Sequence, residues 1–417
     1  MSKYRILILA ESIDIDKSSG VKGRLALIQA FQKLDYAITV LHYSQKDIDL
    51  EGISCMAVYE SKSSFLYVLS RIQRLLNRWF GWDLSDVVDK LFGFSFGFFN
   101  DSRSMRKSLK SFNSKDYDMV WTLSMGNSYR THKAVLDLEE WHENWYAYVH
   151  DPFPQQLYPR PYNYVPHGYR KKRMFFRAVC DKAFRVVFPS LGLKEWLQSY
   201  YTPVLNKSLV IPHQIPEGIG DSMKLPEFFR KNCFSILHAG NLLDLRDPSI
   251  IIEAYTMFLQ KYPEASEESS LMFIGKSSVY TEYLKGKYKE LPSLYVSGDY
   301  MPFEIVYNLQ NTVSVNVILE AKSEISPFLP GKFSHCVTAD KPIIFVGPYY
   351  SECKRLLGDE YPYIFDFDKV KELSQAIGKL YKQWKTNPGT LVLNRPDLMN
   401  YLSKEYLKDV IENDKLI

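Results

Sequence analysis

The segment Ser-Pro-Phe-Leu-Pro-Gly-Lys, residues 326–332, joins a proline-bounded loop to the start of a predicted short helix. A helix start presents unpaired backbone N–H groups and the positive end of the helix dipole, both of which favour a phosphate. Lys332 adds a mobile positive charge at the same point. Many helices begin with a lysine and bind nothing, so the pattern is a modest signal by itself. It makes a phosphate site the first hypothesis.

Polar residues also follow two predicted strands of the C-terminal half. Gly240 follows the strand 234–238, where a glycine allows a ligand to approach the backbone closely, and Arg246 lies in the loop beyond it. Lys276 follows the strand 271–274. We predict that Arg246 and Lys276 converge on a diphosphate, because guanidinium binds oxyanions through two donors and ammonium acts as a point charge. Surface salt bridges are the alternative interpretation.

The N-terminal half offers two candidates. His150 ends the strand 146–150, and ligands of open α/β sheets bind at that edge of the sheet. Its imidazole can donate to a ligand hydroxyl, with Asp151 orienting it. Gly20 lies in a small, basic loop, residues 18–24, at a predicted helix start that matches neither GxGxxG nor a P-loop. A histidine satisfied by backbone and an ordinary flexible turn are the respective alternatives.

Short apolar runs rich in β-branched residues alternate with amphipathic helical stretches along the whole chain, which predicts parallel sheets covered by helices. Two series of about six strands imply two doubly wound domains. The predicted strands are 5–10, 38–43, 56–59, 118–123, 146–150 and 185–189, and then 209–212, 234–238, 271–274, 294–296, 314–318, 343–346 and 363–365. We predict domains over 1–205 and 206–390, followed by a helical segment, 391–417, after the Pro388-Gly389 break.

Composition bounds the class of protein. The chain has 417 residues, which favours two domains, and 46% hydrophobic with 24% charged residues indicates a globular protein. The five cysteines show no metal-ligand spacing, so we expect a reducing compartment and no structural metal. No apolar run approaches the ~20 residues that span a bilayer. We therefore expect a cytoplasmic protein.

The net charge of +4 is unevenly distributed. Residues 160–185 hold eight Lys or Arg against one acid, and residues 61–110 hold nine against four, in both cases among aromatic residues. A basic, aromatic surface suits anionic lipid headgroups. We predict contact with a membrane surface through Lys171, Lys172 and Arg173; a packed helix with a solvated basic end is the alternative. No nucleic-acid-binding motif is present, so nucleic acid is not an expected partner.

Residues 326–332 with Lys341-Pro342-Ile343, and 238–248 with His-Ala-Gly-Asn-Leu and Arg-Asp-Pro, resemble the donor-binding segments of retaining GT-B glycosyltransferases of the family-four type, which build bacterial surface polysaccharides. The resemblance implies two Rossmann-like domains facing a cleft, with the acceptor on the N-terminal domain, a nucleotide diphosphate sugar such as a UDP-sugar on the C-terminal domain, and a C-terminal helix crossing back to the N-terminal domain. It also implies retention of configuration, no cofactor and no required metal.

The same resemblance implies roles for individual residues. His150 would contact the transferred sugar, and Gly20 would approach the diphosphate or the acceptor. Arg246 and Lys276 would neutralise the leaving group. The nucleotide base would lie against Tyr300 and Met301. The donor diphosphate would be bound by Phe328, Leu329, Pro330, Gly331 and Lys332.

Two positions depart from the family pattern. Relatives often carry two glutamates eight residues apart, which fall here on Pro327 and His335. We expect His335 to stand in for the ribose-binding glutamate, although an imidazole lacks the paired acceptors of a carboxylate. The sequence thus predicts a glycosyltransferase acting on a glycan or lipid-linked saccharide. A non-catalytic nucleotide-binding or partner module and a nucleotide-sugar epimerase on the same fold remain as alternatives.

Overall fold

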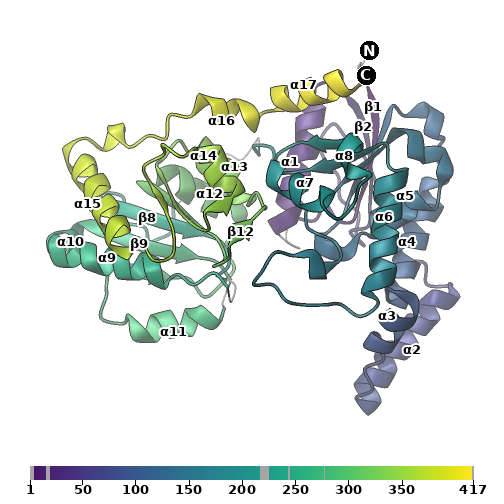
Figure 1. The fold of residues 1–417 in the computed structure, drawn as a ribbon, viewed down its shortest axis with the longest axis horizontal. Helices are drawn as coiled ribbons and strands as arrows, with labels where there is room; N and C mark the ends of the chain where they lie inside the picture. The colour runs from purple at the N-terminus through teal and green to yellow at the C-terminus, as the bar shows by residue number, and fades with distance from the viewer. Residues whose placement is uncertain (1–3, 16–18, 217–224, 243–244, 277, 416–417) are drawn as a thin grey trace. The chain divides into compact units, whose positions relative to one another are not determined.

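The protein is described by a computed structural model over residues 4–15, 19–216, 225–242, 245–276 and 278–415. Its contacts divide the chain into two compact units (Figure 1). Unit 1 comprises Met1–Pro216 with Lys404–Ile417, and unit 2 comprises Glu217–Ser403. Each unit is a parallel sheet covered by helices, as the strand–helix alternation predicts.

Unit 1 is built on a seven-stranded sheet of order β3-β2-β1-β4-β5-β6-β7, with every pairing parallel. The central strands are buried on both faces, which explains their unbroken apolar sequences. The strands are β1 (Arg5–Ala10), β2 (Ala37–His42), β3 (Ser54–Ala57), β4 (Met119–Leu123), β5 (Trp145–Tyr148), β6 (Arg185–Phe188) and β7 (Ser208–Val210).

Helices cover both faces of this sheet, since two separate hydrophobic clusters pack against it. The helices are α1 (Ser19–Lys33), α2 (Phe65–Phe80), α3 (Ser85–Phe92), α4 (Phe96–Leu109), α5 (Arg130–Leu136), α6 (Tyr169–Lys182), α7 (Leu191–Gln198), α8 (Val204–Lys207) and α17 (Lys404–Lys415). Short 3₁₀ turns occupy Ser114–Asp116, Gly126–Ser128, Glu139–Asn144 and Gln155–Leu157.

Unit 2 is built on a six-stranded parallel sheet of order β10-β9-β8-β11-β13-β15, beside a two-stranded pairing of β12 with β14. Its strands are β8 (Phe234–Ala239), β9 (Ser269–Ile274), β10 (Leu294–Val296), β11 (Val315–Leu319), β12 (Ile325–Ser326), β13 (Ile343–Val346), β14 (Tyr350–Ser351) and β15 (Ile364–Phe365). Its helices are α9 (Ser249–Lys261), α10 (Ala265–Glu268), α11 (Val279–Lys287), α12 (Phe303–Thr312), α13 (Lys332–Thr338), α14 (Glu352–Leu357), α15 (Val370–Thr386) and α16 (Pro396–Tyr401), with a 3₁₀ turn at Pro388–Thr390.

The predicted domain boundaries need two corrections. Residues 206–216 belong to unit 1 and not to the second domain, because β7 pairs in parallel with β6 and extends the first sheet. Residues 391–403 belong to unit 2, and the predicted single helix after Arg395 is two helices, α16 and α17. Of the described helices beyond residue 390, only α17 belongs to unit 1, where Asp414 pairs with Arg185 and accepts from the hydroxyl of Tyr146 at 2.9 Å.

Candidate functional site

The ammonium of Lys332 lies over Gly240, at the edge of the second sheet where its strands end. A Cβ atom at Gly240 would lie 2.5 Å from Nζ of Lys332, and the φ of Gly240 is +147°, a conformation that side chains other than glycine rarely adopt. A side chain at this position would strain the backbone and displace the ammonium of Lys332. The structure brings together Gly240 and Lys332, which lie 92 residues apart in the sequence.

His238, within β8, orients Lys332. Its Nδ1 lies 3.2 Å from the carbonyl of Val317 and its Nε2 lies 3.3 Å from Nζ of Lys332. Burial, with Lys332 and Arg246 nearby, holds the pKa of His238 well below its usual range, so the ring is neutral. A neutral ring with this geometry donates from Nδ1 to Val317 and accepts from Lys332 at Nε2.

Arg246 is the second cation of the cluster. Its charge helps to depress the pKa of both His238 and Lys332, which places it close to both. Burial is the larger cause for Lys332, and together the two effects lower the pKa of its ammonium to about 7. The buried Nε of Arg246 has no hydrogen-bond partner in the described part of the chain. An anion bound here would pair with the unpartnered Nε of Arg246. It would also raise the pKa of Lys332 and so keep its ammonium charged.

Glu320 completes the cluster. It follows β11 directly, is almost fully buried, and has two carboxyl oxygens without a hydrogen-bond partner among the described residues. Burial raises the pKa of its carboxyl to about 7, although Ser326, Ser351, Cys353 and Arg246 all favour the charged form. Glu320 in turn favours the charged form of Lys332. Near neutral pH this carboxyl therefore tunes how much positive charge the cluster carries.

The side chains, more than a helix dipole, make this site. The helix that starts at Lys332 is α13, which has only seven residues and therefore a weak dipole. Leu329 is buried, the carbonyl of Pro330 accepts from the N–H of Phe333 at 2.8 Å, and Gly331 is exposed at the helix start. Leu329 and Pro330 therefore fix the path of the loop to Lys332. The partly buried Phe328 completes that loop.

Lys276 follows β9, and its backbone lies beside Asn241, the neighbour of Gly240. It is exposed, its ammonium lies 5.5 Å from the ring centre of Tyr300, and its backbone N–H donates to Asn241 at 2.9 Å. Tyr300 is half exposed, and Met301 packs against a small hydrophobic cluster below it. The cation whose charge the structure couples to Arg246 is Lys332, whereas the sequence pattern favours Lys276 as its partner.

His335 lies one turn further along α13. Its ring centre is 5.1 Å from that of Phe303 and 5.6 Å from that of Tyr307, both of α12 (Phe303–Thr312). The side chain is partly exposed. Its neighbour Cys336 is buried, as expected of a core residue.

In unit 1, His150 follows β5 and lies beside a second histidine. The rings of His150 and His213 stack with their centres 6.1 Å apart. Burial holds the pKa of His150 well below its usual range. The nearby His213, Arg24 and His132 lower it further. Its Nε2 is buried without a hydrogen-bond partner among the described residues. His150 is therefore a neutral group with one unused ring nitrogen.

Arg24 of α1 is a residue that the sequence analysis missed. Its Nε donates to the carbonyl of Ser12 at 3.1 Å and its Nη1 to that of Ser124 at 2.9 Å, each following a central strand. The side chain is 1% exposed, and Nη2 has no partner among the described residues. The sequence gives little sign of the role of Arg24, which is one of several basic residues in a loop and helix start. Glu320 and His238 are equally hard to single out, because they lie in or next to apolar strand segments.

Gly20 lies in the exposed first turn of α1, and the neighbouring residues 16–18 are outside the described part of the chain. Glu11, which follows β1, is nearly buried and fully engaged: it accepts from the N–H of Met125 at 2.9 Å and from Ser128 and Arg130. Arg130 also lies 3.1 Å from Asp101. This ion-pair network braces the strand ends of unit 1.

Two of the three predicted membrane cations, Lys171 and Lys172, have partners within the protein. Lys172 pairs with Asp89 at 2.6 Å and donates to the carbonyl of His167 at 2.8 Å. Lys171 donates to the carbonyl of Leu91. Arg173 is exposed. Lys171 and Lys172 thus stabilise the packing of α6 against α3, which is the packed-helix alternative for these two residues.

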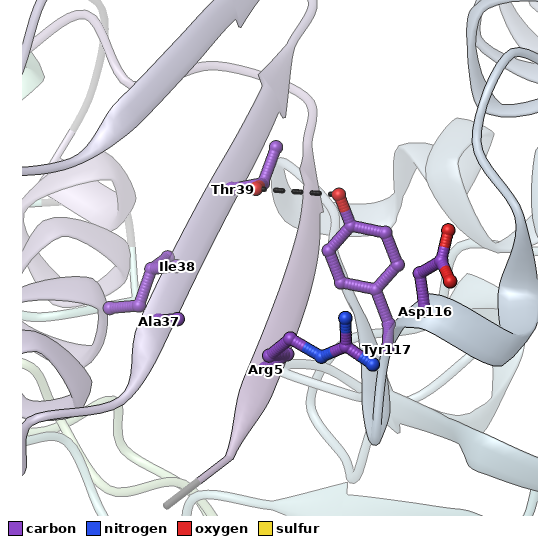
Figure 2. Close-up of a pocket in the computed structure, with 6 residues that line it drawn as sticks. All are labelled: Arg5, Ala37, Ile38, Thr39, Asp116 and Tyr117. Atoms are coloured by element: carbon purple, nitrogen blue, oxygen red, sulfur yellow. Dashed lines mark hydrogen bonds between the residues drawn. The ribbon is translucent and has the colours of Figure 1, made fainter. Parts of the chain in front are cut away.

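A hollow elsewhere in unit 1 is a weaker candidate for a binding site. A hollow of about 380 Å³ is lined by Arg5, Ala37, Ile38, Thr39, Asp116 and Tyr117 (Figure 2). It lies where β1 and β2 begin, which is the edge opposite to the one where parallel sheets bind ligands. The described residues contain no cluster of three or more metal-binding side chains, and none of the described helices is long and apolar enough to cross a membrane.

The fold is that of the two-domain sugar-nucleotide transferases known as GT-B. A trehalose-6-phosphate synthase, OtsA, is similar over 99% of both chains, with a TM-score of 0.61 and 12% identity. A UDP-forming trehalose-phosphate synthase from Burkholderia xenovorans, solved with glucose-6-phosphate, gives a TM-score of 0.63 at 12% identity over 99% of both chains. Anabaena Alr3699/HepE, solved with UDP and glucose, gives 0.59 at 12% identity over 99% of this chain and 100% of that one.

These likenesses confirm the expected fold class, with parallel sheets of seven and six strands. At 11–14% sequence identity, these likenesses show the fold and not the substrate or the activity. No protein-family model matches the sequence, and no curated protein matches it. The family-four resemblance therefore stays a sequence-based expectation.

Proposed function

We propose that this protein is a glycosyltransferase that uses a nucleotide diphosphate sugar, with UDP as the first nucleotide to test. The observation that carries the proposal is the cluster of Arg246, Lys332 and the buried His238 around Gly240. It lies at the ligand-binding edge of the second sheet, within a fold shared with proteins solved with UDP and sugars. A half-buried pair of cations, one with a lowered pKa and one with an unpartnered Nε, is suited to a diphosphate.

In the proposed reaction, the bond between the anomeric carbon and the β-phosphate oxygen breaks, an acceptor hydroxyl oxygen bonds to that carbon, and the hydroxyl proton passes to the departing phosphate oxygen. Negative charge accumulates on the departing nucleoside diphosphate. Arg246 and Lys332 would stabilise that charge in a site with little competing water. His150, a neutral imidazole with one unused nitrogen, would bind a hydroxyl of the transferred sugar. Retention of configuration and independence from metal follow from the family resemblance.

The second part of the proposal concerns the acceptor that receives the sugar. The unused Nη2 of Arg24 is a donor suited to an acceptor's sugar hydroxyls or sugar phosphate, and two structural neighbours were solved with saccharides of those kinds. The family resemblance favours a glycan or lipid-linked saccharide in cell-surface polysaccharide synthesis, with the enzyme working at the cytoplasmic membrane surface. Lys276, Tyr300, Met301 and His335 would then bind the nucleotide end of the donor.

Titration calorimetry with UDP and GDP tests the proposal first. We expect UDP to bind to the wild type and to lose affinity in Lys332→Ala, with Lys371→Ala on the exposed face of α15 as the matched control. A panel of UDP-sugars with release of UDP as the signal then tests transfer. Binding without any release would favour the non-catalytic nucleotide-binding module, and no binding of either nucleotide would overturn the proposal.

A further inference from the structure

Helix α2 carries its apolar residues on the exposed side. Phe65, Val68, Ile72, Leu75 and Trp79, which we call the α2 stripe, follow a spacing of three and four residues and therefore share one face. All five are exposed, Phe65 by 72% and Trp79 by 70% of their surface. The buried residue of the helix is Ser70. An ordinary surface helix shows the opposite arrangement, so the α2 stripe is suited to an apolar environment outside the chain.

The exposed apolar surface continues beyond the helix. Phe80 and Trp82, both 60% exposed, stand at the left-handed turn that ends α2, and their ring centres are 5.4 Å apart. In α3, Val87, Leu91 and Phe92 are also exposed. Aromatic residues of this kind favour the boundary between water and lipid, since each ring can bury its apolar body near polar headgroups.

Basic residues flank the α2 stripe. Arg71, Arg74 and Arg78 recur at the same three- and four-residue spacing on the adjoining face, and all three are exposed. The sixteen residues of α2 contain no aspartate or glutamate. An apolar face bordered by cations is the pattern of helices that lie in the plane of an anionic bilayer.

The protein holds the helix at its first turn and leaves the stripe uncovered. Ser64 caps the helix by accepting from the N–H of Tyr67 at 3.0 Å and also pairs with Asn100 of α4. The N–H of Ser61 donates to Ser104 of α4 at 3.0 Å. Gln73 donates to Ser85 of α3 at 3.1 Å. Within unit 1, α2 and α3 project beyond the helices that cover the sheet (Figure 1).

We propose that the α2 stripe docks on an anionic membrane surface, with Arg71, Arg74 and Arg78 contacting lipid headgroups. A second copy of this chain is the less suitable occupant, because two α2 helices would bring six arginines together with no acidic residue in either helix. The inference deepens the membrane-associated part of the proposed function and rests on it. It also moves the docking surface from Lys171 and Lys172, whose ammonium groups hold α6 against α3, to α2. Arg71 lies 3.8 Å from Glu60 and Arg74 donates to Ser70 of the same helix, and both side chains are exposed.

Co-sedimentation with vesicles containing about 30% phosphatidylglycerol in phosphatidylcholine tests the proposal at low salt. We expect the wild type to bind these vesicles and to bind pure phosphatidylcholine vesicles much more weakly. Leu75→Gln with Trp79→Gln should reduce the partition coefficient by on the order of 10- to 100-fold, through lost apolar burial. Arg71→Gln, Arg74→Gln and Arg78→Gln together should reduce it by on the order of 100-fold.

Matched controls come from exposed residues of unit 2. Val279→Gln with Tyr283→Gln removes two exposed apolar side chains, and Lys285→Gln, Lys371→Gln and Lys379→Gln removes three exposed cations. Both sets should leave binding unchanged. Raising the salt concentration should weaken wild-type binding, because headgroup attraction is screened within about 8–10 Å at physiological ionic strength.

Tryptophan fluorescence locates the contact. Three of the seven tryptophans, Trp121, Trp141 and Trp145, are fully buried, whereas Trp79 and Trp82 are widely exposed. Brominated lipid should quench the wild type and leave the Trp79→Phe and Trp82→Phe double variant, which keeps its aromatic face, almost unquenched. Quenching that persists in this variant would place the contact elsewhere and overturn the proposal.

The remaining outcomes are also decisive. Absence of binding at low salt, or binding indifferent to the α2 substitutions, overturns the membrane proposal. A dimer in sedimentation velocity that disappears in Leu75→Gln with Trp79→Gln, without vesicle binding, assigns the stripe to a second copy instead. UDP affinity should be unchanged in every α2 variant, so failure of membrane docking is distinguishable from failure of the proposed transferase function.

Discussion

The two sheets of this protein end in polar edges of different electrostatic character. In unit 2, Arg246 has a buried donor without a described partner, and Lys332 is held at a pKa of about 7 by burial and by Arg246. In unit 1, the buried acid Glu11 is satisfied by Met125 and two further donors. The histidines of that edge are neutral, since burial lowers the pKa of His132 to about 3 and that of His150 well below its usual range.

This difference separates two kinds of binding. An edge with surplus positive charge and unmet donors is suited to a phosphate, because the anion pairs with Arg246 and raises the pKa of Lys332. The edge of unit 1 has a compensated Glu11, neutral imidazoles and the unpartnered Nη2 of Arg24, and it is suited to hydroxyl groups, which need donors and acceptors more than net charge. We therefore expect unit 2 to bind the diphosphate and unit 1 to bind sugar hydroxyls.

The largest effect is expected for Arg246→Ala, which tests the positive edge of unit 2. We expect turnover to fall roughly 10²–10³-fold, the scale observed when one donor to a transition-state anion is removed. Thermal unfolding should show an intact fold. Lys276→Ala is the informative companion, because its exposed ammonium over Tyr300 should matter less than Arg246, whose Nε is buried. Unchanged turnover with wild-type donor affinity in Arg246→Ala would refute the assignment.

The pH dependence of UDP-sugar binding tests Lys332. Its pKa is lowered to about 7 in the unliganded site, and a bound diphosphate should raise it. The ammonium is charged below pH 7, so affinity should be highest there and fall up to about tenfold per pH unit between pH 7 and 9. Calorimetry in buffers of different ionisation enthalpy should detect proton uptake on binding near pH 8.

Two variants sharpen the same measurement. Lys332→Arg keeps a fixed charge and should flatten the pH dependence while retaining binding. Glu320→Gln removes the nearby carboxyl that favours the ammonium, so the fall in affinity should begin at lower pH. A pH profile identical in wild type and Lys332→Arg would show that Lys332 does not titrate on binding.

His150→Ala tests the neutral edge of unit 1. We expect kcat to fall about 10- to 100-fold with little change in donor affinity, since the proposed contact is with the transferred sugar and not with the nucleotide. His142→Ala, at a histidine that lies 3.2 Å from the carbonyl of Leu136, serves as the control. Loss of UDP binding with an unchanged rate at saturation would reassign His150.

The smallest expected effect belongs to His335→Glu. A carboxylate can accept from both ribose hydroxyls, so donor affinity should be preserved or rise by up to about tenfold. His335 packs against Phe303 and Tyr307, and the melting temperature should be compared with that of His335→Gln to separate packing from binding. A large loss of affinity in the glutamate variant, with equal stability, would exclude the ribose role.

Local sequence patterns determined much of this protein. The apolar runs at 294–296 and 343–346 are β10 and β13 at the predicted bounds, and the alternation with helices predicted two parallel sheets. Gly240 and Lys332 could be singled out because glycine after a strand and lysine at a helix start are visible within a few residues. Such features depend on backbone preference and periodicity, which neighbouring residues set.

The tertiary structure decided which of these residues meet. β8 lies between β9 and β11, so Arg246, which follows β8, has neighbours on both sides, and its charge is coupled to Lys332 and Glu320. The unmet carboxyl of Glu320 and the orientation of His238 also depend on burial, which arises only when distant strands assemble. Exposure of the α2 stripe has the same origin: an amphipathic pattern shows that a helix has an apolar face, and only the packed chain shows that the face is left uncovered.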